Sequence, residues 1–493
     1  MPELLIVADD LTGALDTGVQ LVKLGLPARI LPAPCAGAAL GADGAPGSGE
    51  GSGVGVDPIA GADRSPVADG GYTDWDEPGG PVLVLVAETR HCAPEEAYRT
   101  LSAVFRKARD LAVPVIYKKT DSALRGNIGS ELQAMLDVYP GESVCFVPAF
   151  PAAGRTTQGG VQYIDGRPVA DSPFGRDPLS PVRESFIPAW LREKGLVHPC
   201  RPVGKGAFPF SATEGYPGYT RTEDHVYTDG ETRVAGEVFI FDADTDEDLR
   251  RIVSAIHAAA VPEGRLRLMA GCAGFAQMLP RLLRSRGEAS QMPPDAPAPQ
   301  RASHSRDACD PPVPPARYVL PDGPLLVFSG SRNEITLEQI AFAAKRGFIC
   351  REISEEILFA EDTEADAGTP TVPGEADVIL YPAAEAFLRL PPRQATGPDP
   401  HSMAQRMGLL GKQLRDRFPD RLMMVVGGDT LAAFLRNIGT TALFPLDEIE
   451  PGVVLAKGMP GDFLCIAKSG GLGGIDTFIR VREYSRDHRK SRE

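Results

Sequence analysis

The sequence predicts an α/β protein of two domains, each a largely parallel sheet flanked by helices, with a cleft between the domains. Three observations lead to this fold class. An apolar run, a polar or glycine-rich turn and an amphipathic helix follow one another repeatedly, which is the order of a parallel sheet with crossover helices. At 493 residues the chain is longer than one ordinary domain. A proline-rich, apolar-poor stretch at 287–317 predicts a linker between domains at 1–286 and 318–493.

The first strand-to-helix turn carries two acids. The apolar run at 4–8 ends at Asp9 and Asp10, and helical spacing follows. Ligands of parallel sheets bind beyond the carboxyl ends of the strands, so these carboxylates are placed for chemistry. The alternative is that Asp10 or Thr12 only caps the helix by accepting a backbone N–H.

Strands are expected at 28–31 and 82–87. Residues 33–80 between them consist mainly of Gly, Ala, Pro, Ser and Asp, a composition that buries too little apolar surface to order itself. We therefore interpret 33–80 as a disordered insertion. The acid and base at 88–90 follow the second of these strands, and a helix is expected at 94–111 because Pro94 suits a first helical turn.

The densest polar chemistry follows an expected strand at 115–117. It comprises Lys118, Lys119, Asp121, Ser122 and Arg125. Cations beside an acid and a hydroxyl suit an anionic, polyhydroxylated ligand, because an arginine can bind a carboxylate through two parallel hydrogen bonds. The alternative is an exposed charged loop with a local ion pair, which would contribute little to stability.

A third polar loop follows the apolar run at 144–147. Prolines and glycines shape it, and it carries Arg155. Asp165 and Gly166 predict a hairpin turn, whereas 195–235 is expected to be irregular. The small residues at 271–274 favour close packing of a helix on the sheet more than a ligand site.

Three turns beyond the linker share one pattern, a buried strand followed by a Gly/Ser turn and a helix. They read FSGSRNE, VVGGDTLAA and AKSGGLGGID. Helix N-termini and glycine backbone accommodate phosphates, so the three turns together predict a nucleotide-phosphate site. The alternative is ordinary tight turns of an α/β domain. No G-x-x-x-x-G-K-[ST] motif or dinucleotide fingerprint occurs, and no histidine cluster has metal-ligand spacing. We name no metal ligand, and expect any metal to be Mg²⁺ arriving with the phosphates.

Composition limits the partners. Lys and Arg number 51 against 66 Asp and Glu, a net charge of −15 that argues against binding to nucleic acid or anionic membranes. The eight cysteines form no C-x-x-C pair, the N-terminus shows no signal segment, and no run approaches the length of a membrane span. A cytoplasmic protein without a membrane partner is expected, and a homo-oligomer stays open.

The motifs together resemble the four-carbon acid sugar kinases, which include threonate, erythronate and 3-oxo-tetronate kinases. The resemblance rests on ADDLTGALDTG, AETR, KKTDSALRGNIGSEL, PAFPAAGRTT and DP-SPV in the first half, with SGS, GGDT and KSGGLGG in the second. It covers most of the chain apart from 33–80 and the linker. In place of the small residue and serine that usually follow SGS in the family, this chain has Arg332 and Asn333.

The resemblance implies that the N-terminal domain binds the sugar acid and the C-terminal domain binds ATP with Mg²⁺. By motif position, the implied catalytic residues are Asp10, Asp121 and Arg125, and the implied substrate-binding residues are Asp9, Arg90, Lys119, Ser122 and Arg155. The implied nucleotide-binding residues are Ser331, Gly427, Gly428, Asp429, Thr430, Gly470 and Gly471.

The motifs and the resemblance converge on phosphoryl transfer. Our hypothesis is that Asp10, or alternatively Asp121, accepts the proton of the attacking hydroxyl while the glycine turns hold the triphosphate. Two other functions stay open at this point. One is a nicotinamide-dependent oxidoreductase of a small hydroxy acid, against which the missing fingerprint counts, and the other is a non-catalytic sugar-acid sensor.

Overall fold

The computed structural model describes residues 2–32, 81–177, 180–208, 236–260, 267–283, 318–331, 333–354, 358, 372–374, 376–383 and 400–490. The insertion expected at 33–80 and the linker expected at 287–317 lie outside these residues. The domain boundaries inferred from them therefore stay predictions.

The strands fall into two series along the chain. The N-terminal series is β1 (Leu4–Ala8), β2 (Ala28–Leu31), β3 (Val82–Val86), β4 (Val115–Lys119), β5 (Val144–Val147), β9 (Cys200–Val203), β10 (Val238–Phe241) and β11 (Arg267–Gly271). The C-terminal series is β12 (Gly323–Ser329), β13 (Ile349–Ile353), β14 (Val378–Pro382), β15 (Arg421–Val426), β16 (Ala442–Glu450), β17 (Val453–Met459) and β18 (Phe463–Lys468). A separate small sheet contains β6 (Arg155–Gln158), β7 (Val161–Ile164) and β8 (Arg167–Pro168).

Helices connect these strands. In the N-terminal half they are α1 (Leu11–Lys23), α2 (Pro94–Asp110), α3 (Ile128–Val138), α4 (Ile187–Glu193), α5 (Asp246–Ala260), α6 (Ala273–Ala276) and α7 (Pro280–Leu283), with 3-10 turns η1 (Pro151–Ala153), η2 (Val169–Asp171) and η3 (Pro173–Arg176). In the C-terminal half they are α8 (Glu334–Ala344), α11 (Pro400–Arg417), α12 (Gly428–Asn437) and α13 (Thr477–Lys490).

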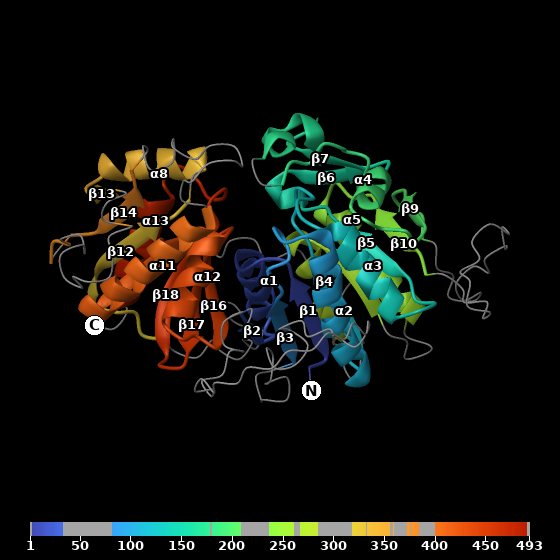
Figure 1. Cartoon of the computed structure of the whole chain (residues 1–493), viewed down its shortest axis with the longest axis horizontal. Coiled ribbons are helices and arrows are strands. Elements are labelled where there is room, and N and C mark those ends of the chain that lie inside the picture. Colours follow the sequence, from blue (N-terminus) through green and yellow to red (C-terminus); the bar gives the residue numbers. More distant parts are fainter. Residues whose placement is uncertain are drawn as a thin grey trace, which may run out of the picture.

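The two series form one long sheet (Figure 1). The N-terminal strands pair in the order β2-β3-β1-β4-β11-β5-β10-β9, and every pair is parallel. The C-terminal strands pair in the order β13-β14-β12-β15-β18-β17-β16, with only β17 and β16 antiparallel to their neighbours. This confirms the expected α/β class with largely parallel strands and flanking helices.

A single antiparallel bridge, between Leu443 of β16 and Ile30 of β2, joins the two series. The sequence predicted two separate sheets, and the structure differs because β2 and β16 are the outermost strands of their series. Pairing of two such edges satisfies backbone groups that would otherwise stay open.

Central strands of the N-terminal half, such as β1, β3, β5 and β10, are buried on both faces, as parallel strands with helices on either side require. In β1, Leu4 and Ile6 belong to one apolar cluster and Leu5 and Val7 to another. Residues of α1 and α5 contribute to the first cluster, and residues of α2, α3 and α4 to the second. This explains why these strands read as continuous apolar runs without polar alternation.

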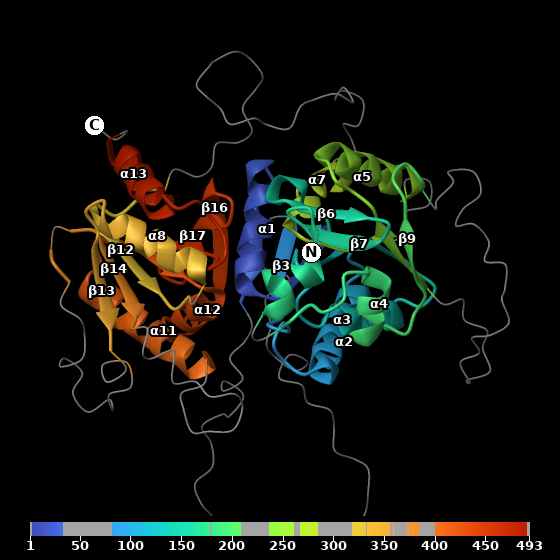
Figure 2. The same ribbon diagram turned by 90° about the horizontal axis from the view of Figure 1, so that it is seen from above.

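Helix α1 lies between the two halves of the molecule (Figure 2). The first apolar cluster continues through it into strands and helices of the C-terminal half. At its C-terminal end, Lys23 forms an ion pair with Glu448 of β16 at 2.5 Å, and Gln20 donates to the same carboxylate at 2.8 Å. A second ion pair, Arg436 with Glu88 at 3.3 Å, also crosses between the halves.

Two local expectations have clear outcomes. The hairpin turn expected at Asp165 and Gly166 connects β7 and β8, and both residues have positive φ. The region 195–235, expected to be irregular, contains the edge strand β9. Its sequence, Cys-Arg-Pro-Val, lacks the apolar run that marks the central strands, because one side of an edge strand has no neighbour.

Candidate active site

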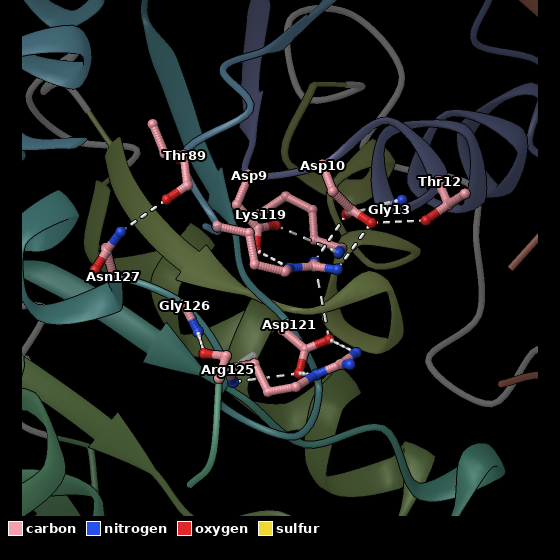
Figure 3. A network of polar contacts seen from close by, with 12 residues as sticks. Asp9, Asp10, Thr12, Gly13, Thr89, Lys119, Asp121, Arg125, Gly126 and Asn127 are labelled. Carbon is pink, nitrogen blue, oxygen red and sulfur yellow. Dashed lines mark hydrogen bonds and ion pairs between the residues drawn. The ribbon is translucent and has the colours of Figure 1, made fainter. Parts of the chain in front are cut away.

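The site begins where three neighbouring strands end. Ala8 of β1 is level with Val86 of β3 on one side and with Lys119 of β4 on the other. Because parallel strands in register end at the same edge, the residues that follow them gather there. Figure 3 shows the side chains of Asp9, Asp10, Lys119 and Asp121 converging at this edge.

Arg90 connects the acids of this cluster. Its Nε donates to Asp9 at 2.8 Å, and its two terminal nitrogens donate to the two oxygens of Asp10 at 2.8 Å each. Its Nη2 also lies 3.8 Å from an oxygen of Asp121. One guanidinium therefore balances carboxylates from two different strand ends.

Asp10 both caps helix α1 and contributes a carboxylate to the charged cluster, the two roles that the sequence left open for it. Its side chain accepts from the Gly13 amide at 3.1 Å and so caps α1. The Thr12 hydroxyl donates to its Oδ2 at 2.6 Å. Capping and the ion pair with Arg90 use the same carboxylate, so Asp10 is fixed in place by the start of the helix that it stabilises.

Asp9 is almost completely buried, and its Oδ1 has no hydrogen-bond partner among the described residues. The Lys119 ammonium lies 4.0 Å from this oxygen. Burial alone would raise the pKa of Asp9, but the positive charges of Arg90 and Lys118 outweigh burial and lower it to about 2. Asp9 is therefore an ionised acceptor at neutral pH.

Lys119 fits beside α1 because the helix has a glycine there. A Cβ on Gly13 would overlap the Lys119 ammonium. The glycine of the ADDLTG motif thus provides space for a cation, in addition to allowing the helix to begin.

Asp121 and Arg125 form a second ion pair next to the first. Arg125 donates from Nε at 3.0 Å and from Nη2 at 2.8 Å to the two oxygens of Asp121. Burial would raise the pKa of Asp121, but Arg125 and Arg90 hold it well below the usual range of a carboxyl. Arg125 also donates to Asp177 at 3.3 Å.

Arg155 comes from the small sheet, on β6. Its guanidinium carbon lies 5.9 Å from the centre of the Phe174 ring, and that of Arg125 lies 5.2 Å from the same ring. The aromatic ring thus brings two cations to one place, a contact favoured by its electron-rich face. Ser122, also expected in the site, is half-buried, and its carbonyl accepts from Gln162 at 3.0 Å.

A buried polar layer lies beneath the site, and Lys118, which the sequence placed among the cations for an anionic ligand, belongs to this layer instead. The Lys118 ammonium lies 3.0 Å from a Glu131 oxygen and donates to the Lys119 carbonyl at 2.7 Å. The Thr89 hydroxyl donates to the other Glu131 oxygen, and Asn127 donates to the Thr89 carbonyl at 2.8 Å. This layer fixes the backbone that carries Arg90 and Lys119. A lysine inside an otherwise apolar strand was the available signal.

The three glycine turns of the C-terminal half meet in space. A Cβ on Gly330 would overlap the Thr430 hydroxyl, and one on Gly470 would overlap the Ser331 hydroxyl. The Gly427 amide donates to the carbonyl of Lys468, two residues before Gly470, at 2.9 Å. Gly427 has a φ of 108°, which favours glycine. Gly471 follows in the same loop, near Asn333.

The acid cluster and the glycine turns adjoin one another. A Cβ on Gly428 would lie 3.4 Å from the Thr12 hydroxyl and 3.8 Å from Asp10 Oδ2. The N-termini of α1 and α12 therefore approach each other with Asp10 between them. Asp429 is exposed on the first turn of α12.

Neither a metal centre nor a membrane span is found in the described part of the chain. No group of three or more His, Cys, Asp or Glu side chains there could hold a metal ion. Within the same ranges, no helix is long and apolar enough to cross a bilayer.

Comparison with known families agrees with this division into two half-sites. Residues 4–279 match a family described as a sugar-binding N-terminal domain, and residues 326–478 match one described as a nucleotide-binding C-terminal domain. A two-part α/β phosphotransferase is the class of protein that this fold and this site define. The chain belongs to the four-carbon acid sugar kinase family. It is an enzyme of the kinase type. This replaces the two alternatives left open by the sequence, a nicotinamide-dependent oxidoreductase and a non-catalytic sugar-acid sensor.

Curated relatives carry three related names. The chain is 26% identical to a D-threonate kinase of Bordetella bronchiseptica, over 99% of this chain and 98% of the relative. It is 26% identical to a 3-oxo-tetronate kinase of Methylobacterium radiotolerans, over 96% and 97%. It is 32% identical to a D-erythronate kinase of Heliobacterium modesticaldum, over 38% of this chain and 35% of the relative.

Two crystal structures share the fold. One, from Salmonella typhimurium, has a TM-score of 0.62 at 20% identity, and the match covers 98% of this chain and 99% of the Salmonella chain. The other, Haemophilus influenzae protein HI1011, has a TM-score of 0.56 at 17% identity, with the same coverage. At these identities the likeness concerns the fold alone.

Proposed function

We propose that this protein is an ATP-dependent kinase that phosphorylates a hydroxyl group of a short sugar acid such as threonate, erythronate or 3-oxo-tetronate. The observation that carries this proposal is the contact between the half-sites, where Gly428 lies against Thr12 and Asp10. A phosphoryl group held at the start of α12 would meet a hydroxyl held at the start of α1. The names of the curated relatives support the substrate class.

On the acid side, the cations supply recognition of the carboxylate. Lys119 and Arg155 are the candidates, because Arg125 is already committed to Asp121 and Asp177. The buried Asp9 oxygen that lacks a partner would accept a hydrogen bond from a substrate hydroxyl. A ligand with one carboxylate and several hydroxyls satisfies both requirements.

Asp10 is the proposed proton acceptor. Its Oδ2 lies beside Gly428, where the transferred phosphoryl group would be held. Asp121 suits this role less, because Arg125 and Arg90 keep its pKa well below the usual range. We assign Asp121 to holding Arg125. Phosphoryl transfer depends mainly on positioning and charge, so a modest base suffices.

On the nucleotide side, residues 427–430, Ser331 and the loop at 469–474 would surround the phosphates. Helix α12 directs its first N–H groups toward this place, and its dipole favours negative charge. The residues also fit Mg²⁺, because the ion commonly uses one carboxylate together with phosphate oxygens, and Asp429 is exposed at the same helix end. When bound, the ion would neutralise phosphate charge.

The domain division at 286 and 318 and the cytoplasmic location belong to this proposal as well. In it, the sugar acid binds to the N-terminal domain and ATP to the C-terminal domain.

The test is an assay of ADP release by the purified protein with ATP, Mg²⁺ and a panel of short sugar acids. The matched control is the four-carbon polyol threitol, which keeps hydroxyls but lacks the carboxylate. We expect ADP release with one or more four-carbon acids and none with threitol. Release that is independent of any acid, or no release with the whole panel, would contradict the proposal.

A further inference from the structure

Lys468, the last residue of β18, is completely buried. Lysine is rarely buried in this way unless its ammonium has partners, because removing the charge from water is costly. The residue stands at the start of the KSGGLGG loop, yet neither the proposed chemistry nor the apolar core accounts for its charge. Its surroundings therefore point to a separate role.

The ammonium of Lys468 binds the backbone of the loop that follows it. It donates to the Ser469 carbonyl at 2.9 Å and to the Gly470 carbonyl at 3.4 Å. The Thr336 hydroxyl of α8 donates to the same Gly470 carbonyl at 2.6 Å. Gln339, one turn further along α8, donates to the carbonyls of Leu472 at 3.3 Å and Gly474 at 2.8 Å.

These contacts draw the loop carbonyls toward the protein interior. In a trans peptide the C=O and N–H groups point in opposite directions. The inward carbonyls of Ser469, Gly470 and Leu472 therefore turn the amides of Gly470, Gly471 and Gly473 outward. Within the described part of the chain, none of these amides donates to a backbone or side-chain acceptor. The Leu472 amide between them donates to the Ser469 carbonyl at 3.4 Å, and the three outward glycine amides together form an anion-binding concavity.

The concavity lies at the proposed phosphate site. Gly470 contacts Ser331, and the Lys468 carbonyl accepts from Gly427 at the start of α12. Lys468 thus fixes two of the three glycine turns at once, one through its ammonium and the other through its carbonyl. Because its ammonium contacts the carbonyls of this loop, its charge is close to the proposed phosphate site.

Resting on the proposed kinase function, we propose that Lys468 is a positioning residue of the nucleotide site. Its ammonium holds the 469–474 loop with the amides facing the triphosphate, and adds a buried positive charge close to it. Lys468 itself does not touch the reacting atoms.

Titration provides a readout of this role. Burial lowers the pKa of Lys468 to about 8, and the Glu450 carboxylate opposes the shift. Glu450 accepts from the Thr477 hydroxyl and lies 3.7 Å from Arg480 of α13, so its own charge is balanced. The ammonium is therefore charged at neutral pH and loses its proton as the pH passes about 8.

The experiment compares ATP and adenosine binding by calorimetry in the full-length wild type, Lys468→Met and the control Lys457→Met. Lys457 is a partly exposed lysine on the neighbouring strand β17. We expect Lys468→Met to weaken ATP binding by about 10-fold or more, as removal of charge-assisted hydrogen bonds does. Adenosine, which lacks phosphates, should bind all three proteins within about two-fold, because the contacts proposed for the loop are with the phosphates.

The pH profile separates positioning from packing. In the wild type, the ratio of ATP to adenosine affinity should fall as the pH rises through about 8. In Lys468→Met this fall should be absent, and subtracting the two profiles removes the titration of ATP itself. If Lys468→Met does not fold, the pH dependence of the ratio of ATP to adenosine affinity in the wild type tests the role of Lys468 by itself.

A folded Lys468→Met that binds ATP like the wild type, or a wild-type ratio that stays flat through pH 8, overturns the role of Lys468 alone. If the wild type binds the sugar acid but does not bind ATP, both the kinase proposal and the proposed role of Lys468 are overturned. An equal loss of ATP and adenosine affinity would show that Lys468 supports only packing.

Discussion

Arg90 is the residue on which the acid cluster depends. Because it contacts Asp9, Asp10 and Asp121, loss of any one carboxylate still leaves its guanidinium paired. Substitutions at Asp10 should therefore affect chemistry more than folding.

Asp10→Asn tests the proposed base. Asparagine keeps the size of the side chain and can still cap α1, but it cannot accept the hydroxyl proton. We expect turnover to fall by a factor on the order of 10² or more, with an unchanged circular dichroism spectrum. Asp110→Asn, at the exposed end of α2, is the control. Near-normal turnover of Asp10→Asn would move the proton to Asp121 or to solvent.

Asp16 on α1 gives a stability prediction with an unusual sign. Burial raises its pKa to about 6, above the usual range of an aspartate, and the neighbouring acid Glu448 adds to the increase. The folded protein thus holds the proton more tightly than the unfolded chain, so Asp16 costs stability as the pH rises from about 4 to 6. Asp16→Asn should remove this cost.

Denaturant unfolding of both proteins without ligand measures this effect. Above pH 6, the free energy of unfolding of the variant should exceed that of the wild type by up to about 3 kcal/mol. The gain should be smaller to the extent that the Asp16 carboxyl remains in contact with water. Asp9 acts in the opposite direction, since its lowered pKa gives stability that is lost as the pH falls from about 4 to 2. That acid-side loss should be the same in both proteins. Equal stabilities at all pH values would show that Asp16 is solvated.

Sequence reasoning at this scale identified residues whose chemistry is visible in a motif. Asp9, Asp10 and Arg90 were placed correctly at one sheet edge because strand ends of a parallel sheet coincide. Their roles as ligands stay predictions. Glu131, Phe174 and Lys468 were missed, because each gains its meaning from a partner brought near only by tertiary packing.

At the scale of elements, the N-terminus of α12 carries the proposed phosphate contact. Gly428→Ala is a sharper test than a larger substitution, because its Cβ would lie at 3.4 Å or more from Thr12 and Asp10 and would disturb neither. We expect weaker ATP binding with unchanged sugar-acid binding, since the methyl group would occupy space needed by phosphate. Calorimetric titration with each ligand separately measures both.

Two further variants complete that test. Gly204→Ala is the neutral control, since a Cβ there would meet nothing within 4 Å. Arg155→Ala should show the reverse pattern, with acid affinity reduced roughly thirty-fold or more, because the carboxylate of the ligand would lose one of its two proposed cationic partners. If Gly428→Ala abolished acid binding while ATP bound normally, the ligands would be assigned to the wrong halves.

Helices and strands were predicted best where a single feature of the sequence, such as an unbroken apolar run, marked the element. Central strands such as β1 and β3 are uniformly apolar because both faces are covered, and their bounds follow from composition alone. The junction of β2 with β16 was not predictable, because one bridging pair, Ile30 with Leu443, leaves no pattern in either segment.

At the scale of the whole molecule, α1 belongs to the cores of both halves. We therefore expect both halves to unfold together in a single calorimetric transition. Leu15→Ala, at a buried position of this helix, should lower that one transition, with a cost of about 2–5 kcal/mol. Leu337→Ala, at an exposed position of α8, should leave it in place. Two separate transitions, with only one shifted by Leu15→Ala, would show that the halves are independent.

The neutral charge of the acid cluster has a kinetic consequence. Asp9, Asp10, Asp121 and Asp177 are matched by Arg90, Lys119, Arg125 and Arg155, so the cluster offers little net attraction over distance, while the chain as a whole carries −15. An approaching sugar acid is then repelled by the protein until it is within contact range. Added salt screens that repulsion, so stopped-flow association should become faster as ionic strength rises, the opposite of an electrostatically steered enzyme. An association rate that falls with salt would reveal a cationic approach path on the surface.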